Sequence, residues 1–170
     1  MLPYLGQPIE TVAVASVDSL LSLSAWRAHE HALSILYYLR ERSENEFIIE
    51  TRKPDHEVMK AVESGNPLDF YRTDIAERKR YNYPPFSVFI GLSSRGTKQA
   101  VEKFGATVKE LFSELDLVGP LPATQDSKSE WSARAVIRIE RGKWPDAMLS
   151  KQLAMLPPDI VVEIDPDEIV

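Results

Sequence analysis

The chain has 170 residues, with 26 Asp and Glu, 20 Lys and Arg, no cysteine and a formal net charge of −6. A length of this order corresponds to one domain, or to one domain with a fragment of another. Without cysteine, the chain cannot form disulfides, thiolate zinc sites, iron–sulfur clusters or a cysteine nucleophile. The negative net charge argues against a protein that coats nucleic acid through bulk charge, because such binding depends on Lys and Arg neutralising phosphates.

No apolar run approaches the ~18–20 residues that a membrane-spanning helix needs. The first ten residues, MLPYLGQPIE, lack the basic and apolar regions of a secretory signal peptide. We therefore expect a cytoplasmic protein with no membrane association.

The first predicted elements form a strand–helix–strand unit. Residues 11–17 (TVAVASV) are a β-branched run of the kind that is buried on both faces of a sheet. A helix over residues 25–42 follows, with Ser22 or Ser24 as its N-cap, and residues 46–51 (EFIIET) predict a second strand. This order indicates a βαβ crossover with a parallel strand pair. Because two strands and one helix cannot bury both faces of their sheet, we interpret the unit as the edge of a larger α/β domain.

Two further helices and a proline elbow come next. Residues 54–63 predict a short helix, which the sequence Ser-Gly-Asn-Pro at 64–67 ends. A second helix is expected over residues 68–80. The sequence Tyr-Pro-Pro-Phe at 83–86 then predicts an extended elbow, because proline fixes its own φ and moves the preceding residue out of the helical region.

The remainder predicts a split β-α-β-β-α-β domain. The helix expected over residues 97–115 carries an apolar stripe at three- and four-residue spacing, which is typical of a helix that packs on a sheet. In this plan both helices cover one face of a mostly antiparallel sheet. We expect strands over residues 86–93, 117–123, 133–140 and 160–164, and helices over residues 97–115 and 145–156.

Common catalytic motifs are absent from the sequence. It contains no phosphate-binding loop, dinucleotide-binding glycine motif, nucleophile elbow or H-E-x-x-H zinc motif. His29 and His31 are two residues apart on a predicted helix and so point to different faces, while His56 lies in the capping region of another helix. The carboxylates in residues 163–168 lack the spacing of a calcium loop, and we interpret them as an acidic tail. We expect no metal site and no catalytic residue.

Two basic segments are candidate nucleic-acid contacts. Arg78, Lys79 and Arg80 end a predicted helix, and Tyr81 and Tyr83 follow directly. Basic side chains beside aromatic rings suit single-stranded nucleic acid. However, cations at a helix C-terminus also complement the helix dipole, which explains the cluster without any ligand.

The second basic segment runs from residue 128 to residue 143 and includes Trp131 as well as Arg141 and Lys143. Arg134 and Arg138 share strand parity and should project from one face of the sheet. An ordinary polar sheet face is the alternative explanation. The candidate DNA-binding residues are Arg78, Lys79, Arg80, Tyr83, Lys128, Trp131, Arg134 and Arg138.

Four segments together resemble a known family. They are FIIETRKPDH (residues 47–56), DFYRTDIAERKRYNYPPF (69–86), LVGPLPA (117–123) and VVEIDPDEIV (161–170). In this order and at this spacing they are similar to the C-terminal end of the PriA family of bacterial primosomal replication-restart helicases (primosomal protein N′). The resemblance covers residues 12–170.

Members of this family are ATP-dependent 3′→5′ DNA helicases that bind stalled forks and start reloading of the replicative helicase. The resemblance implies that residues 12–51 are an edge of the second RecA-like helicase lobe. It also implies a C-terminal domain that helps to bind branched or single-stranded DNA. That domain helps to form a site for the tail of the single-stranded-DNA-binding protein, SSB.

The chain departs from the family pattern at several positions. The family motif with the arginine finger is replaced by ILYYLRERSENE (residues 35–46), in which only Arg40 and Arg42 could correspond to it. The family's basic segment before the third strand reads Ser-Glu-Trp-Ser here (129–132), and residues 142–146 offer neither Arg nor Gln to the SSB tail. The Walker motifs and zinc-binding cysteines of the family are not in this chain. We therefore expect no ATPase activity and no cofactor for the chain alone, with ATP, Mg²⁺ and Zn²⁺ only in a full-length family member.

We divide the chain into a partial helicase lobe (1–52), a helical linker with the elbow (53–85) and a PriA-like C-terminal domain (86–170). The expected role is DNA or fork binding and docking of SSB or primosome proteins. The alternative is a non-catalytic protein–protein adaptor of the replication machinery without DNA contact, which the acidic net charge favours. A strong dependence of binding on salt would distinguish DNA contact from the adaptor.

Overall fold

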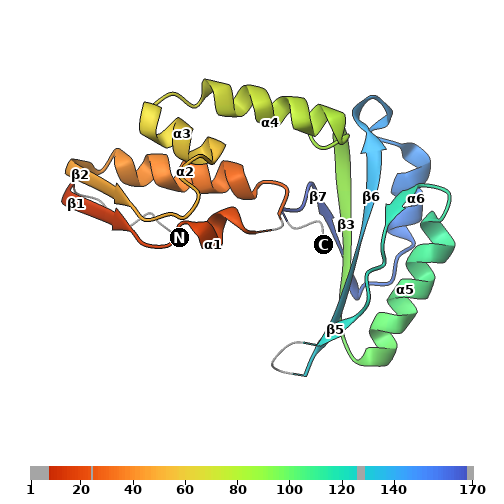
Figure 1. Cartoon of the computed structure of the whole chain (residues 1–170). Coiled ribbons are helices and arrows are strands. Elements are labelled where there is room, and N and C mark those ends of the chain that lie inside the picture. The colour runs from red at the N-terminus through yellow and green to blue at the C-terminus, as the bar shows by residue number, and fades with distance from the viewer. Residues whose placement is uncertain (1–7, 24, 126–128, 168–170) are drawn as a thin grey trace. The chain divides into compact units, whose positions relative to one another are not determined.

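The computed structural model describes residues 8–23, 25–125 and 129–167 (Figure 1). These residues form six α-helices and two sheets, which confirms the mixed α/β class. The chain divides into two compact units, Met1–Ile75 and Ala76–Val170. The three-part division expected from the sequence stays a prediction.

The first unit begins with the expected βαβ crossover. Strand β1 (Ile9–Val14) pairs in parallel with β2 (Ser43–Ile49), and helices α1 (Asp18–Leu21) and α2 (Ala28–Arg40) connect them. The sequence predicts that the strand within residues 11–17 is buried on both faces, and this prediction is wrong for the described residues. Val12 is buried, whereas Thr11 and Ala13 are exposed and Ile48 is 51% exposed, because the helices cover only one face of the pair.

The start of α2 also differs from the expectation. Ser22 ends α1, where its hydroxyl donates to the Asp18 carbonyl at 2.7 Å, and Ser24 lies outside the described residues. Arg27 occupies the N-cap of α2 and provides no side-chain cap. The Asp18 carboxylate joins the start of α1 to the residues that follow β2: it accepts from the Thr51 hydroxyl at 2.7 Å and from Arg52 Nε at 3.0 Å. These hydrogen bonds lower the pKa of Asp18 to about 2.

Helix packing forms the core of the first unit. Ala32, Leu33 and Leu36 lie at three- and four-residue spacing on one stripe of α2, and they pack against α3 (Glu57–Ser64) and Phe70 of α4 (Leu68–Arg80). The Tyr37 hydroxyl donates to the Ala61 carbonyl at 2.9 Å and adds a polar link between α2 and α3. The bounds of α4 are those expected from the sequence.

The capping role expected for His56 is confirmed. Its Nδ1 accepts a hydrogen bond from the Val58 N–H at 3.2 Å, at the start of α3. Partial burial lowers the pKa of His56, and the neighbouring His29, whose ring centroid is 4.7 Å away, and Lys53 lower it further. The cap requires the unprotonated Nδ1, so this helix start is sensitive to pH.

We expect the first unit to lose stability as the pH falls below the ordinary histidine value of 6.5. The folded state binds the proton less tightly than the unfolded state, so His56 stabilises the fold above pH 6.5, and this contribution disappears as the pH falls through its lowered pKa. The variant His56→Asn keeps a good N-cap without a titrating group, and its melting temperature should change less between pH 7.5 and pH 5. Equal pH dependence in the two proteins would contradict this role.

The second unit contains one five-stranded antiparallel sheet with two helices on one side (Figure 1). The main strands follow the order β4-β6-β3-β7, and β5 pairs with β6. The predicted split β-α-β-β-α-β plan is confirmed. Its elements are β3 (Ser87–Gly96), α5 (Lys98–Phe112), β4 (Asp116–Val118), β5 (Thr124–Gln125), β6 (Trp131–Glu140), the 3₁₀ turn η1 (Arg141–Lys143), α6 (Ala147–Ala154) and β7 (Ile160–Ile164).

The core of the second unit lies between α5 and the sheet. Phe104 and Phe112 of α5 are buried against Ile90 of β3 and Ile137 of β6. The Thr97 hydroxyl accepts from the Ala100 N–H at 3.2 Å and caps the helix. The apolar stripe expected on this helix is therefore confirmed.

Three local predictions for the second unit are wrong. Of the strand expected over residues 117–123, only residues 117 and 118 lie in a strand, β4, and β5 begins at Thr124, because Gly119 has φ +94° and Pro120 cannot donate to a strand ladder. The elbow is a turn and not extended, since the Phe86 N–H donates to the Tyr83 carbonyl at 2.9 Å. Helix α6 begins after Asp146, whose carboxylate accepts from the Leu149 N–H at 2.7 Å, and so excludes Pro145.

Candidate nucleic-acid interface

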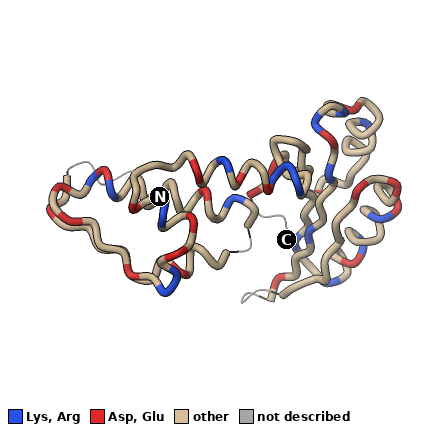
Figure 2. Tube along the Cα trace, turned by 45° about the horizontal axis from the view of Figure 1, so that its top comes forward, with Lys and Arg blue, Asp and Glu red and all other residues tan. Residues whose placement is uncertain are grey.

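The basic run of α4 ends in a fixed backbone turn. Asn82 has φ +53°, its N–H donates to the Lys79 carbonyl at 3.3 Å, and the Tyr83 N–H donates to the Arg78 carbonyl at 2.8 Å. This pair of bonds is the Schellman motif, which satisfies the last carbonyls of a helix. The Ser87 hydroxyl donates to the Asn82 carbonyl at 2.6 Å and joins the turn to β3. The sequence therefore positions its three consecutive cations at the beginning of the sheet (Figure 2).

The two tyrosines after the basic run have different environments. Tyr83 is half-buried, with its ring edge-on to Phe89 at a centroid distance of 5.3 Å. Tyr81 is 53% exposed, and the Arg80 guanidinium lies 5.4 Å from its ring centroid. Base stacking needs an exposed aromatic face, so Tyr81 is better placed for it than Tyr83, the residue selected from the sequence.

Arg134 and Arg138 lie on the same face of the sheet, as their strand parity predicts. Their β3 partners, Ser93 and Phe89, belong to the face opposite the core residues. We call this the helix-free face, because α5 and α6 cover the other side. The Arg138 guanidinium binds the Asp116 carboxylate of β4 at 3.0 Å, so part of its charge is neutralised within the sheet.

The candidate residues do not form one patch. Ser87 pairs with Glu140 at one end of the long β3–β6 ladder, and Gly96 pairs with Trp131 at the other end. Ten residues per strand separate these ends by about 30 Å. The run Arg78–Arg80 therefore lies near Arg138, whereas Trp131 lies at the far end; Lys128 is outside the described residues.

The turn η1 adds two cations to the first end of the ladder. The Arg141 N–H donates to the Phe86 carbonyl at 3.1 Å, which holds η1 beside the elbow. Lys143 forms an ion pair with Glu140 at 2.9 Å. We define the elbow-end cluster as Arg78, Lys79, Arg80, Arg138, Arg141 and Lys143, with Tyr81 and Tyr83. The sequence analysis grouped Arg141 and Lys143 with Trp131 because they are close in the sequence, and the register of β3 with β6 places them at opposite ends of the ladder.

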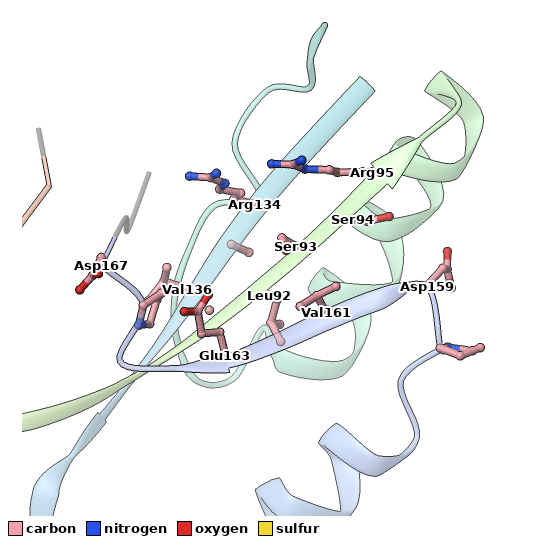
Figure 3. Close-up of a pocket in the computed structure, with 14 residues that line it drawn as sticks. Leu92, Ser93, Ser94, Arg95, Arg134, Val136, Asp159, Val161, Glu163 and Asp167 are labelled. Atoms are coloured by element: carbon pink, nitrogen blue, oxygen red, sulfur yellow. The ribbon is translucent and has the colours of Figure 1, made fainter. Parts of the chain in front are cut away.

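A pocket of about 760 Å³ lies on the helix-free face between β6, β3 and β7 (Figure 3). Gly91 contributes to this pocket, and a Cβ there would lie 2.8 Å from the Pro166 ring. Arg95 and Arg134 project from the same side of the sheet, and Glu163 of β7 also lines the pocket. Arg95 was missed by sequence analysis, and its pairing opposite Ser132 on the face of Arg134 becomes evident only from the register.

A second depression lies between α5 and α6, beside η1. It has a volume of about 450 Å³ and includes Leu115, Met148 and Gln152 among its lining residues. Met148 is 71% exposed, and Gln152 Nε2 donates to the Leu111 carbonyl at 3.1 Å. Residues 142–146 contain no Gln, but in the fold Gln152 lines the same depression as Lys143.

The other candidate ligands were also located. His29 and His56 lie together at the N-cap of α3, and His31 is exposed. Among residues 8–23, 25–125 and 129–167, no group of three or more His, Asp or Glu side chains could hold a metal ion. No helix in the described part of the chain is long and apolar enough to cross a membrane.

The second unit is thus a split β-α-β-β-α-β domain with a basic, tyrosine-flanked elbow at one end of its sheet. The chain belongs to the family of primosomal protein N C-terminal domains (PriA_C), whose sequence model matches residues 79–167, just over half of the chain. This assignment confirms the family resemblance. The match begins within the basic run of α4.

Two curated relatives share this similarity over 68% of the chain. The chain is 31% identical over 127 residues to the replication restart protein PriA of Synechocystis sp. (strain ATCC 27184 / PCC 6803 / Kazusa), and covers 15% of that protein. It is 27% identical over 126 residues to the replication restart protein PriA of Borreliella burgdorferi (strain ATCC 35210 / DSM 4680 / CIP 102532 / B31), and covers 19% of it. The chain therefore spans less than a fifth of the length of these relatives.

Proposed function

We propose that this chain is the C-terminal part of a PriA-like replication-restart helicase and that its second unit contacts single-stranded or forked DNA. The observation that carries the proposal is the elbow-end cluster, in which the Schellman turn fixes the backbone of three consecutive cationic residues beside the exposed Tyr81. Because this backbone is already ordered, DNA binding carries no entropic cost for ordering it. An exposed ring beside them offers a stacking surface for an unpaired base.

The first unit has a separate role in this proposal. Its parallel β1–β2 pair leaves Thr11, Ala13 and Ile48 exposed on one face, although parallel sheets are normally covered on both faces. This exposure supports the proposal that the unit is an edge of a RecA-like lobe whose other elements belong to a longer cytoplasmic protein. The chain contains no phosphate-binding loop, so ATP hydrolysis is assigned to such a longer protein and not to this chain.

Fluorescence anisotropy with labelled single-stranded and forked DNA tests DNA contact by the whole chain. We expect binding at ~50 mM salt that weakens about twentyfold at ~200 mM, as three neutralised phosphates on a single strand predict. Binding that does not change with salt, or no binding at ~50 mM, would contradict the proposal.

A protein–protein adaptor is the second candidate function. The depression beside α6 supports it, because Met148 and Leu115 expose apolar side chains there. Its rim includes Glu110, Glu114 and Asp146 against the single cation Lys143. This charge pattern is less suited to an acidic tail, such as that of SSB, than to a neutral or basic partner. The adaptor alone would explain a chain that binds a replication protein but no DNA.

A further inference from the structure

Strand β7 is an edge strand with unusual exposure. It pairs only with β3 in the described sheet, and Val161, Val162 and Ile164 are 61%, 40% and 47% exposed. Proteins usually protect such edges with lysine, proline, a bulge or a covering segment, because an open strand edge pairs with other chains. The interior of β7 has neither lysine nor proline, and its register with β3 is regular over all five residues.

The opposite edge of the same sheet is protected. Strand β4 has only three residues, and its Asp116 forms an ion pair with Arg138 of β6. Gly119 and Pro120 follow at once and end the strand. The two edges of one sheet therefore differ, and β7 alone offers a continuous backbone edge of five residues.

The register identifies which amides of β7 point outward. The Asp165 N–H donates to the Phe89 carbonyl at 2.7 Å, and the Phe89 N–H donates to the Asp165 carboxylate at 2.8 Å, so these residues occupy a hydrogen-bonded position of the ladder. Hydrogen-bonded and non-hydrogen-bonded pairs alternate in antiparallel sheets. Val161 and Glu163 consequently bond to β3, while Val162 and Ile164 direct their N–H and C=O groups away from it.

The charges around β7 define the chemistry of a partner strand. Residues 157–167 contain Asp159, Glu163, Asp165 and Asp167 but no Lys or Arg. Arg95 and Arg134 line the same pocket, but they belong to β3 and β6, on the side of β7 away from its open edge. Glu163 lies on the helix-free face and lines the 760 Å³ pocket, as does Asp159 (Figure 3). Val162 and Ile164 lie on the opposite face of the strand. A strand paired with β7 would therefore meet the carboxylates of Asp159 and Glu163, with Val161 between them, on one face and only apolar side chains on the other.

We infer that the β7 edge is a docking site for an extended peptide in which basic and apolar residues alternate. The peptide adds to the sheet as a further strand beside β7. Its basic side chains lie over Glu163 and Asp159, and its apolar side chains lie beside Val162 and Ile164. A second copy of the chain fits less well, because two-fold antiparallel pairing about Val162 would place Asp159 opposite Asp165 of the other copy.

The test uses the fluorescein-labelled peptide Lys-Val-Lys-Val-Lys-Val-Lys and the whole chain. We expect saturable binding in anisotropy at ~50 mM salt, and slower hydrogen exchange at the Val162 and Ile164 amides when the peptide is bound. The peptide Glu-Val-Glu-Val-Glu-Val-Glu should not bind. Absence of binding by the lysine peptide, equal binding by the glutamate peptide, or protection confined to other amides would overturn the inference.

Two variants separate backbone pairing from charge attraction. Val162→Pro removes an outward N–H that β3 does not use and should weaken peptide binding at least about tenfold, whereas Val162→Thr keeps the N–H and should bind within about threefold of the original chain. Glu163→Gln should weaken binding several-fold, and Glu110→Gln on α5 should not. Circular dichroism checks that each variant folds. If Val162→Pro does not fold, the hydrogen-exchange measurement on the original chain decides whether the peptide pairs with β7. Equal affinity of the folded Val162→Pro variant would overturn the pairing.

Discussion

Replacing Phe104 with alanine should lower the free energy of unfolding of the second unit by about 3–5 kcal/mol. Phe104 is 2% exposed and belongs to the cluster that joins α5 to Ile90 and Ile137 of the sheet. Its removal takes away the transfer free energy of the ring and leaves a cavity that the packed sheet cannot close. A change of this size approaches the whole stability of a small domain, so the variant should be largely unfolded at elevated temperature.

Urea unfolding in a Trp26→Phe background measures this change for the second unit alone. The fluorescence then comes from Trp131 and Trp144, both of which pack against the core that contains Phe104. Met148→Ala is the matched control, because Met148 is a long apolar side chain of the same unit but is 71% exposed. It should change stability by less than about 0.5 kcal/mol. Equal effects of the two substitutions would contradict the assigned core.

The triple variant Arg78→Ala, Lys79→Ala, Arg80→Ala should bind single-stranded DNA about tenfold more weakly than the original chain at ~50 mM salt. Each exposed contact between a cation and a phosphate contributes on the order of 0.5 kcal/mol, and three such contacts correspond to about tenfold in affinity. The backbone hydrogen bonds of the Schellman turn do not use these side chains, but Arg78 is half-buried, so circular dichroism checks that the triple variant folds. Anisotropy with one labelled oligonucleotide measures the effect.

A second triple variant controls for net charge. Lys103→Ala and Lys109→Ala on α5, together with Lys151→Ala on α6, remove the same charge from exposed positions on the two helices that cover the other side of the sheet. If DNA is attracted only by the net charge of the chain, both triple variants should lose the same DNA affinity. If DNA contacts the elbow-end cluster, only the first variant should lose affinity. Equal losses would therefore contradict the proposed location of the interface.

The elements of the second unit could be predicted because their patterns are local. The stripe on α5 repeats at helical spacing, and Ile160–Ile164 is an apolar run between acidic and proline-containing segments. Local patterns did not predict that the chain leaves the sheet between the short strands β4 and β5. Residues 117–123 include one glycine and two prolines, which are unfavourable in strands, and Gly119 adopts φ +94° beside the Arg134 carbonyl, 3.1 Å from where a Cβ would lie. Such a tertiary contact leaves no periodic signal.

The candidate site was only partly predictable for the same reason. The run Arg78–Arg80 was evident because it is contiguous, and the shared face of Arg134 and Arg138 followed from strand parity. Arg141 was grouped with Trp131 because they are close in sequence, but the β3–β6 ladder places them at opposite ends. The burial of Tyr83 involves its ring contact with Phe89 of β3, a residue that the sequence analysis did not select. Register therefore decides which basic residues can act together.

The location of the DNA contact is the central claim, and amide chemical-shift mapping tests it most directly. Unlabelled single-stranded DNA would be titrated into the isotope-labelled chain at ~50 mM salt. Our proposal predicts that the largest shifts occur at the amides of the Arg78–Tyr83 turn and of Arg141–Lys143. Shifts centred on Trp131 at the far end of the ladder, or no shifts at saturating DNA, would contradict it.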